Sequence, residues 1–129
     1  MIAAPIDIII RKAPQLRTRQ PDMCYLNSDK TGIRTRRDAQ RMPAIEVAPD
    51  LVVELLSSDE RRQSLAGKLA DYAVLGVLEA WLVSPEAETI EVLSLEGESH
   101  ARCGLFGRGD FVKSAALPGL NLAVDSIVE

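Results

Sequence analysis

Short apolar runs separated by turn residues dominate the hydrophobic pattern of this chain. Their β-branched and aliphatic composition is typical of strands rather than of long helices. The pattern predicts strands at residues 6–10, 18–26, 50–56, 79–83, 89–95, 99–105 and 111–113. The strand at 18–26 is interrupted at Pro21, because proline cannot donate to a sheet ladder. The two strands that flank Glu96-Gly97 form an antiparallel hairpin.

One main helix is predicted after the strand at 50–56. Ser57 with Glu60 three residues later fits a capping box, and Gly76 is a natural terminator after a helix that ends near Leu75. A strand, a helix and a second strand at this spacing form a crossover unit with parallel strands. A last helical turn is expected near residues 124–128. The fold class is therefore α/β, with a mixed β-sheet, one main crossover helix and a C-terminal antiparallel hairpin.

Two charges break this pattern. Glu54 lies inside the apolar run Leu51–Leu56, where a carboxylate is costly unless it is paired, protonated or bound to a metal. Lys68 falls within the apolar stripe of the helix, beside Leu69 and Tyr72. Positions at which local rules are broken are often functional, although Glu54 could also be a structural acid paired with an arginine such as Arg19.

Asp22 supplies a second carboxylate. If its strand lies beside the strand at 50–56, Asp22 and Glu54 converge and could hold Mg²⁺, or Mn²⁺ in its place, with the main-chain carbonyl of Leu55 as a further ligand. Such a metal lowers the pKa of a bound water and polarises a phosphate. Lys68 near that water would stabilise charge. We therefore expect Asp22, Glu54 and Lys68 to be catalytic.

The composition of the chain bears on its domain count, its location and its partners. The 129 residues, 47% of them hydrophobic, suffice for one domain, and no apolar run is long enough to cross a bilayer, so no membrane partner is expected. Two cysteines without CxxC spacing favour the cytoplasm. The net charge of −4 is unevenly spread. The first third is basic, and its candidate nucleic-acid contacts are Arg34, Arg36, Arg37 and Arg41. DNA is the expected partner.

An ordered set of motifs resembles the Uma-two family of restriction-endonuclease-like proteins, in the PD-(D/E)XK nuclease superfamily. The motifs are Arg19-Gln20-Pro21-Asp22, Ala48-Pro49-Asp50-Leu51-Val52-Val53-Glu54-Leu55-Leu56-Ser57, Lys68 with Tyr72, Gly76-Val77, Glu79-Ala80-Trp81-Leu82-Val83 and Leu117-Pro118-Gly119-Leu120. The resemblance implies a restriction-endonuclease-like core and magnesium-dependent cutting of phosphodiester bonds. It implies Asp22 and Glu54 as metal ligands. Leu56 stands where the superfamily has its lysine, which makes Lys68 a migrated lysine.

The sequence also departs from the family. Members usually carry a longer N-terminal region with a helix and a glutamate-bearing strand, so we expect residues 1–129 to be one domain that lacks part of that region. Ser84 stands where an aspartate is expected. An alternative is therefore an inactive, shortened relative that binds DNA or a protein. A missing layer would leave apolar sheet surface exposed, which favours a homodimer.

Overall fold

The computed structural model describes residues 2–3, 7–11, 17–19, 21–25, 44–45, 48–56, 62–97 and 99–127. The predicted capping box at Ser57 and Glu60 lies outside these residues, as do the arginines at positions 34, 36, 37 and 41. The side chain of Arg19 lies outside them as well.

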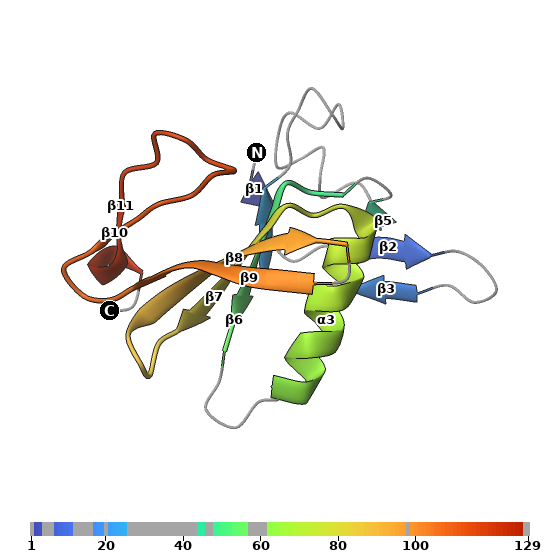
Figure 1. Ribbon diagram of the computed structural model, residues 1–129, viewed down its shortest axis with the longest axis horizontal. Coiled ribbons are helices and arrows are strands. Elements are labelled where there is room, and N and C mark those ends of the chain that lie inside the picture. Colours follow the sequence, from blue (N-terminus) through green and yellow to red (C-terminus); the bar gives the residue numbers. More distant parts are fainter. Residues whose placement is uncertain are drawn as a thin grey trace.

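A six-stranded mixed sheet forms the centre of the molecule (Figure 1). Its strands in spatial order are β1 (Ile2–Ala3), β4 (Met23–Tyr25), β6 (Leu51–Leu55), β7 (Glu79–Ser84), β8 (Thr89–Glu96) and β9 (Ser99–Phe106). Within this sheet β6 and β7 run parallel, and every other neighbouring pair is antiparallel. The predicted crossover unit and hairpin are thereby confirmed.

Two smaller sheets complete the described strands. The first holds β3 (Arg17–Arg19), β2 (Asp7–Arg11) and β5 (Ala44–Ile45), and the second pairs β10 (Phe111–Val112) with β11 (Leu122–Ala123). A 3₁₀ turn, η1 (Val124–Ser126), follows β11.

The interruption predicted at Pro21 is confirmed, but the prediction that residues 18–26 belong to one strand was wrong. These residues divide into β3 and β4, which belong to different sheets. The division falls at Pro21, which is fully buried between them. Proline has no N–H to offer a ladder, so the chain leaves one sheet before it and enters the next one after it.

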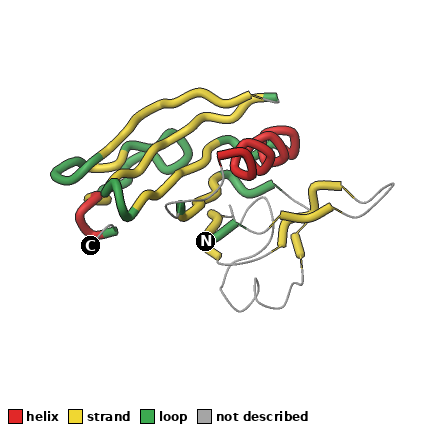
Figure 2. The backbone as a smooth tube through the Cα atoms, turned by 90° about the horizontal axis from the view of Figure 1, so that it is seen from below, coloured by secondary structure: helices red, strands yellow, loops and turns green. Residues whose placement is uncertain are grey.

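The helix α3 (Arg62–Leu75) connects β6 to β7 and lies against one side of the sheet (Figure 2). It ends at Gly76, whose φ of +110° suits a residue without a β-carbon. The N–H of Val77 donates to the carbonyl of Tyr72 at 2.9 Å, and the N–H of Gly76 donates to that of Ala73 at 3.2 Å. This Schellman motif fixes the last turn of the helix. No helix in the described ranges has the length and apolar composition that a bilayer span needs.

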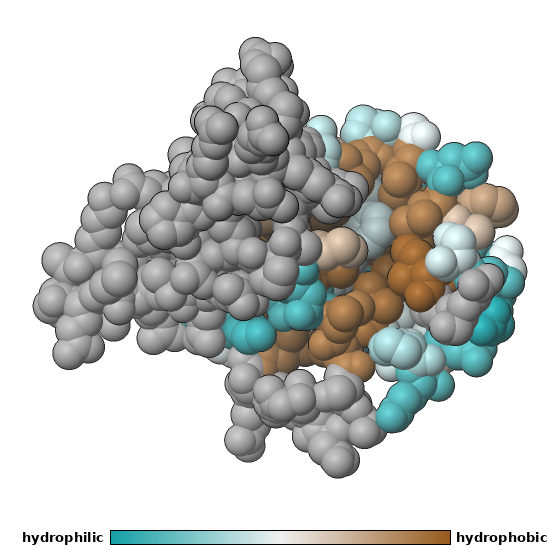
Figure 3. Space-filling model, turned by 180° about the vertical axis from the view of Figure 1, so that it is seen from behind, coloured by the Kyte–Doolittle hydropathy of each residue, from teal (hydrophilic) through white to brown (hydrophobic). Residues whose placement is uncertain are grey.

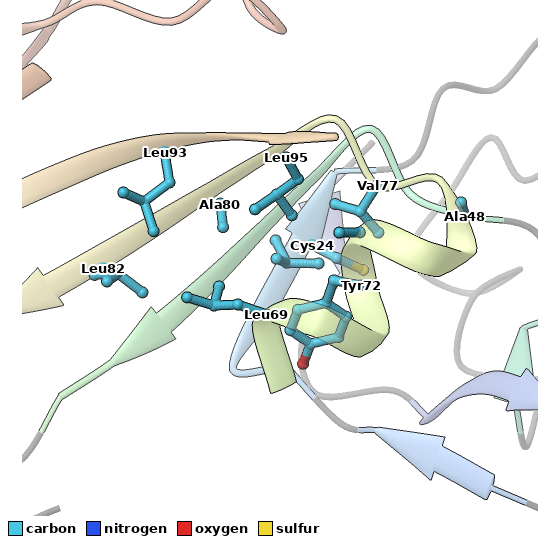
Figure 4. Close-up of a cluster of buried hydrophobic side chains, with 11 residues drawn as sticks. Cys24, Ala48, Leu69, Tyr72, Val77, Ala80, Leu82, Leu93 and Leu95 are labelled. Carbon is cyan, nitrogen blue, oxygen red and sulfur yellow. The ribbon is translucent and has the colours of Figure 1, made fainter. Parts of the chain in front are cut away.

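The core has two layers, one on each face of the sheet. Alternation along β6 sends Val52 toward α3 and sends Leu51 and Val53 to the opposite face. The layer beneath α3 contains Cys24, Ala48, Val52, Leu69, Tyr72, Ala73, Val77, Ala80, Leu82, Leu93 and Leu95 (Figure 4). The second layer contains Leu51, Val53, Trp81, Val83, Ile90, Val92, Val112 and Val124. Strand β6 therefore contributes to both layers.

Glu79 is a buried carboxylate that attaches the C-terminal part of the chain to the second face. Its side chain accepts the indole N–H of Trp81 at 2.8 Å and the backbone N–H groups of Ala115 at 3.0 Å and Ala116 at 3.4 Å. The hydroxyl of Ser114 donates to it as well. Four donors satisfy a charge whose residue is only 3% exposed. Such a carboxylate holds the segment 114–116 onto β7.

We predict that Glu79→Ala lowers the free energy of unfolding by about 3 kcal/mol, because it leaves buried donors of Trp81 and the 114–116 segment without an acceptor. Urea unfolding measures this loss. Glu96→Ala, at an exposed position of β8, is the control and should change stability by less than about 0.5 kcal/mol. Equal effects of the two substitutions would contradict the prediction.

Candidate functional site

Glu54 is the centre of the candidate site. It lies near the carboxyl end of β6 on the face that α3 covers, and it is 3% exposed. Its Oε2 accepts a hydrogen bond from the Tyr72 hydroxyl at 2.8 Å. Its Oε1 lies 3.2 Å from the Nζ of Lys68, in an ion pair. The two oxygens of one buried carboxylate thus have different partners, one neutral and one charged.

Lys68 and Tyr72 reach Glu54 from one face of the helix. They are four residues apart, so their side chains lie one turn from each other on the same side. Tyr72 is fully buried, and its ring packs into the layer beneath α3 (Figure 4). The side chain of Lys68 keeps 31% of its surface exposed. The lysine therefore occupies the edge of the site, and the tyrosine occupies its interior.

Asp22 joins the site from the residue directly before β4. The first residue of β4, Met23, is paired with Val53 of β6 in the antiparallel register. The Oδ2 of Asp22 accepts the backbone N–H of Leu55 at 2.7 Å. Strand β4 therefore lies beside β6, which is the condition under which the two carboxylates were expected to converge. The catalytic roles of Asp22, Glu54 and Lys68 stay predictions.

Burial raises the pKa of the Glu54 carboxyl above its usual range. The hydrogen bond from Tyr72 and the positive charge of Lys68 lower it in part, and the negative charge of Asp22 raises it further. The carboxylate of Asp22 is therefore near enough to disfavour the charged form of Glu54. A divalent cation between them would relieve both the repulsion and the cost of burial.

The donor set fits magnesium. Mg²⁺ takes oxygen ligands and is commonly held by one or two protein carboxylates, with water and substrate phosphate completing its shell. Asp22 and Glu54 supply two such groups. Among the described residues no group of three or more His, Cys, Asp or Glu side chains could hold a metal ion, so a denser site of the zinc type is not present there.

Comparisons with known proteins identify a family and a shared fold. The model of the Uma2 family, described as "Putative restriction endonuclease", matches residues 2–125. The chain belongs to the Uma2 family. The match covers nearly the whole chain, and it confirms the family that the motif set indicated from sequence alone.

A solved structure shares the fold. It is the crystal structure, at 1.96 Å resolution, of a "putative nuclease belonging to DUF820" from Anabaena variabilis ATCC 29413. The TM-score is 0.72 at 15% sequence identity, and the match covers 98% of the present chain. The present chain spans 66% of the length of that protein. The likeness confirms the restriction-endonuclease-like fold. No curated protein matched the chain.

Two contacts of this site were not predicted from the sequence. The hydrogen bond from the hydroxyl of Tyr72 to Glu54 was not predicted. The signal was the spacing of four residues between Tyr72 and Lys68. The bond from the N–H of Leu55 to Asp22 depends on the pairing of β4 with β6, which no local pattern encodes.

The pKa of Glu54 predicts a pH-dependent contribution to stability. Because the folded pKa is raised, the contribution of this group is fully present below its unfolded pKa of about 4.3 and is lost as the pH rises through the folded pKa. Glu54→Gln removes this titration. The unfolding free energy of the native chain should therefore fall relative to that of Glu54→Gln over this pH window.

Urea unfolding of both proteins at pH values from about 4 to about 9 measures this difference. Groups that do not interact with Glu54 titrate alike in both proteins, so their contributions to the unfolding free energy cancel in the comparison. A difference that does not change with pH would show that the Glu54 carboxyl has the same proton affinity in the folded and unfolded chains.

Proposed function

We propose that this chain is a metal-dependent endonuclease that hydrolyses phosphodiester bonds of DNA, with Mg²⁺ as the native ion and Mn²⁺ as a substitute. The observation that carries the proposal is the buried Glu54, held by Lys68 at 3.2 Å and by Tyr72 at 2.8 Å, with the carboxylate of Asp22 bonded to the N–H of the next residue, Leu55, at 2.7 Å. Membership of the Uma2 family supports the same reaction class.

Each residue has a role in this proposal. Asp22 and Glu54 bind the metal, which when present supplies a Lewis acid for the phosphate and a water of lowered pKa. In an extended strand the N–H and C=O of one residue point to the same side. The N–H of Leu55 points at Asp22, so its carbonyl is directed to that side too and is available as a third ligand. Lys68 stabilises negative charge at the phosphate.

The proposal also covers the DNA contacts, the cellular location and the domain organisation of the protein. Arg34, Arg36, Arg37 and Arg41 would contact the DNA backbone, which offsets the net charge of −4 near the substrate. We place the protein in the cytoplasm, since Cys24 and Cys103 are both free thiols. We treat residues 1–129 as a single domain.

Magnesium-dependent cleavage of plasmid DNA tests the proposal. We expect the native chain to nick or linearise the plasmid with Mg²⁺, and to stop when the metal is chelated. Glu54→Gln and Asp22→Asn should each lower the rate by about 100-fold or more, because each removes a metal ligand.

Glu79→Gln is the matched control. Glu79 is a glutamate on the neighbouring strand with the same 3% exposure as Glu54, but on the other face of the sheet. Its activity per folded molecule should equal that of the native chain. If Glu54→Gln cleaves as fast as the native chain, the site is rejected. Metal-independent binding of DNA without cleavage would instead favour the alternative, an inactive binding module.

We further propose that two copies associate. Apolar side chains gather across the middle of the face shown in Figure 3, beside a hydrophilic border. The exposed large hydrophobic residues of the described chain are Met23, Leu55, Val74, Leu78, Leu105, Phe111 and Ile127. Light scattering should then give about twice the chain mass of 14.1 kDa. The mass of one chain at every concentration tested would overturn this part of the proposal.

A further inference from the structure

The two partners of Glu54 differ in how easily they can leave it. Tyr72 is fully buried, and its own carbonyl accepts the N–H groups of Gly76 and Val77 in the Schellman motif. Its hydroxyl cannot withdraw without unpacking the end of α3. Lys68 stands at the edge with 31% of its side chain exposed, on a flexible four-carbon stem. Its ammonium can move into water while its stem stays on the helix.

The two oxygens of Glu54 therefore have separate uses. Oε2 is held by a neutral donor that stays in place, which fixes the orientation of the carboxylate. Oε1 is held by a cation that can be exchanged for another cation. A metal at Oε1 and the ammonium of Lys68 at 3.2 Å from the same oxygen would repel each other, since both are positive.

We propose that Lys68 is the resident counter-ion of the metal-free site, and that a divalent metal binds by displacing its ammonium from Oε1 of Glu54. This inference rests on the proposed function. After displacement the ammonium remains at the edge of the site, where it is free to bind the scissile phosphate. Lys68 would thus neutralise the charge of Glu54 in the metal-free site and would then bind the substrate.

Charge counting fits a phosphodiester as the ligand that follows. With all three groups charged, Asp22, Glu54 and Lys68 leave the metal-free site with one net negative charge, and the carboxylate of Glu54 is buried. A divalent ion changes this to one net positive charge, which a phosphodiester with its single negative charge neutralises. The exchange thereby converts a cation site into an anion site, so metal is expected to bind before the nucleic acid does.

Binding of Mn²⁺ alone, followed by electron paramagnetic resonance, tests the exchange without any cleavage. The measurement is made at about pH 8.5, so that protons compete little with the metal. Lys68→Met removes the competing charge and keeps the length of the stem. It should bind Mn²⁺ about fivefold or more tighter than the native chain, although it cleaves DNA more slowly.

Two further variants separate charge from packing. Lys68→Arg keeps the cation and should bind Mn²⁺ about as tightly as the native chain does. Tyr72→Phe removes a neutral donor to the same carboxylate and should bind Mn²⁺ no more tightly than the native chain. Circular dichroism establishes that each variant is folded.

The outcomes distinguish this inference from the proposed function. If the native chain binds Mn²⁺ and Lys68→Met binds it no more tightly, the counter-ion role is wrong and the metal site stands. If Lys68→Arg binds as tightly as Lys68→Met, the effect is not one of charge and the role is again wrong. If neither the native chain nor Lys68→Met binds Mn²⁺, the metal-dependent function fails together with the inference.

Discussion

The carboxylate of Glu54, buried between β6 and α3, is the constraint on which the rest of the site depends. Burial makes its charge expensive, so the helix must bring donors to it. Lys68 and Tyr72 do so from adjacent turns, and the Schellman motif at Gly76 sets where those turns end. The same face of β6 carries Val52 into the core. The packing of α3 on the sheet therefore also brings the residues of the site together.

The second buried acid shows why Glu54 rather than Glu79 is the candidate for chemistry. Both residues are 3% exposed, on neighbouring strands of one sheet. Glu79 receives four donors, two of them backbone N–H groups, and has no exchangeable partner among the described residues. Glu54 has two donors, and one is a cation that reaches solvent. A saturated carboxylate stabilises a fold, whereas one with a displaceable partner can accept a ligand.

Local patterns predicted most of the large sheet and its helix. The strands at 50–56, 79–83, 89–95 and 99–105 are β6 to β9 within one or two residues, since apolar composition and turn chemistry are local properties. The two-residue strands β1, β5 and β11 were missed, although the equally short β10 was found within the predicted strand at 111–113. The division of residues 18–26 between two sheets could not be predicted, because no local pattern shows which sheet each half joins. The sequence likewise marked Glu54 and Lys68 as misplaced charges, but long-range pairing gives them their partners.

The fold and the side chains of the site support different parts of the proposed function. The likeness to a nuclease structure at 15% identity shows that the backbone is shared, and a shared backbone hosts many functions. The family adds a reaction class. What this chain adds is an electrostatic arrangement among its described residues: the buried carboxylate of Glu54, the nearby carboxylate of Asp22 and the partly exposed ammonium of Lys68. A site at which two carboxylates and one ammonium meet is one that the proposed divalent ion would fit, because oxygen ligands and water suit its coordination.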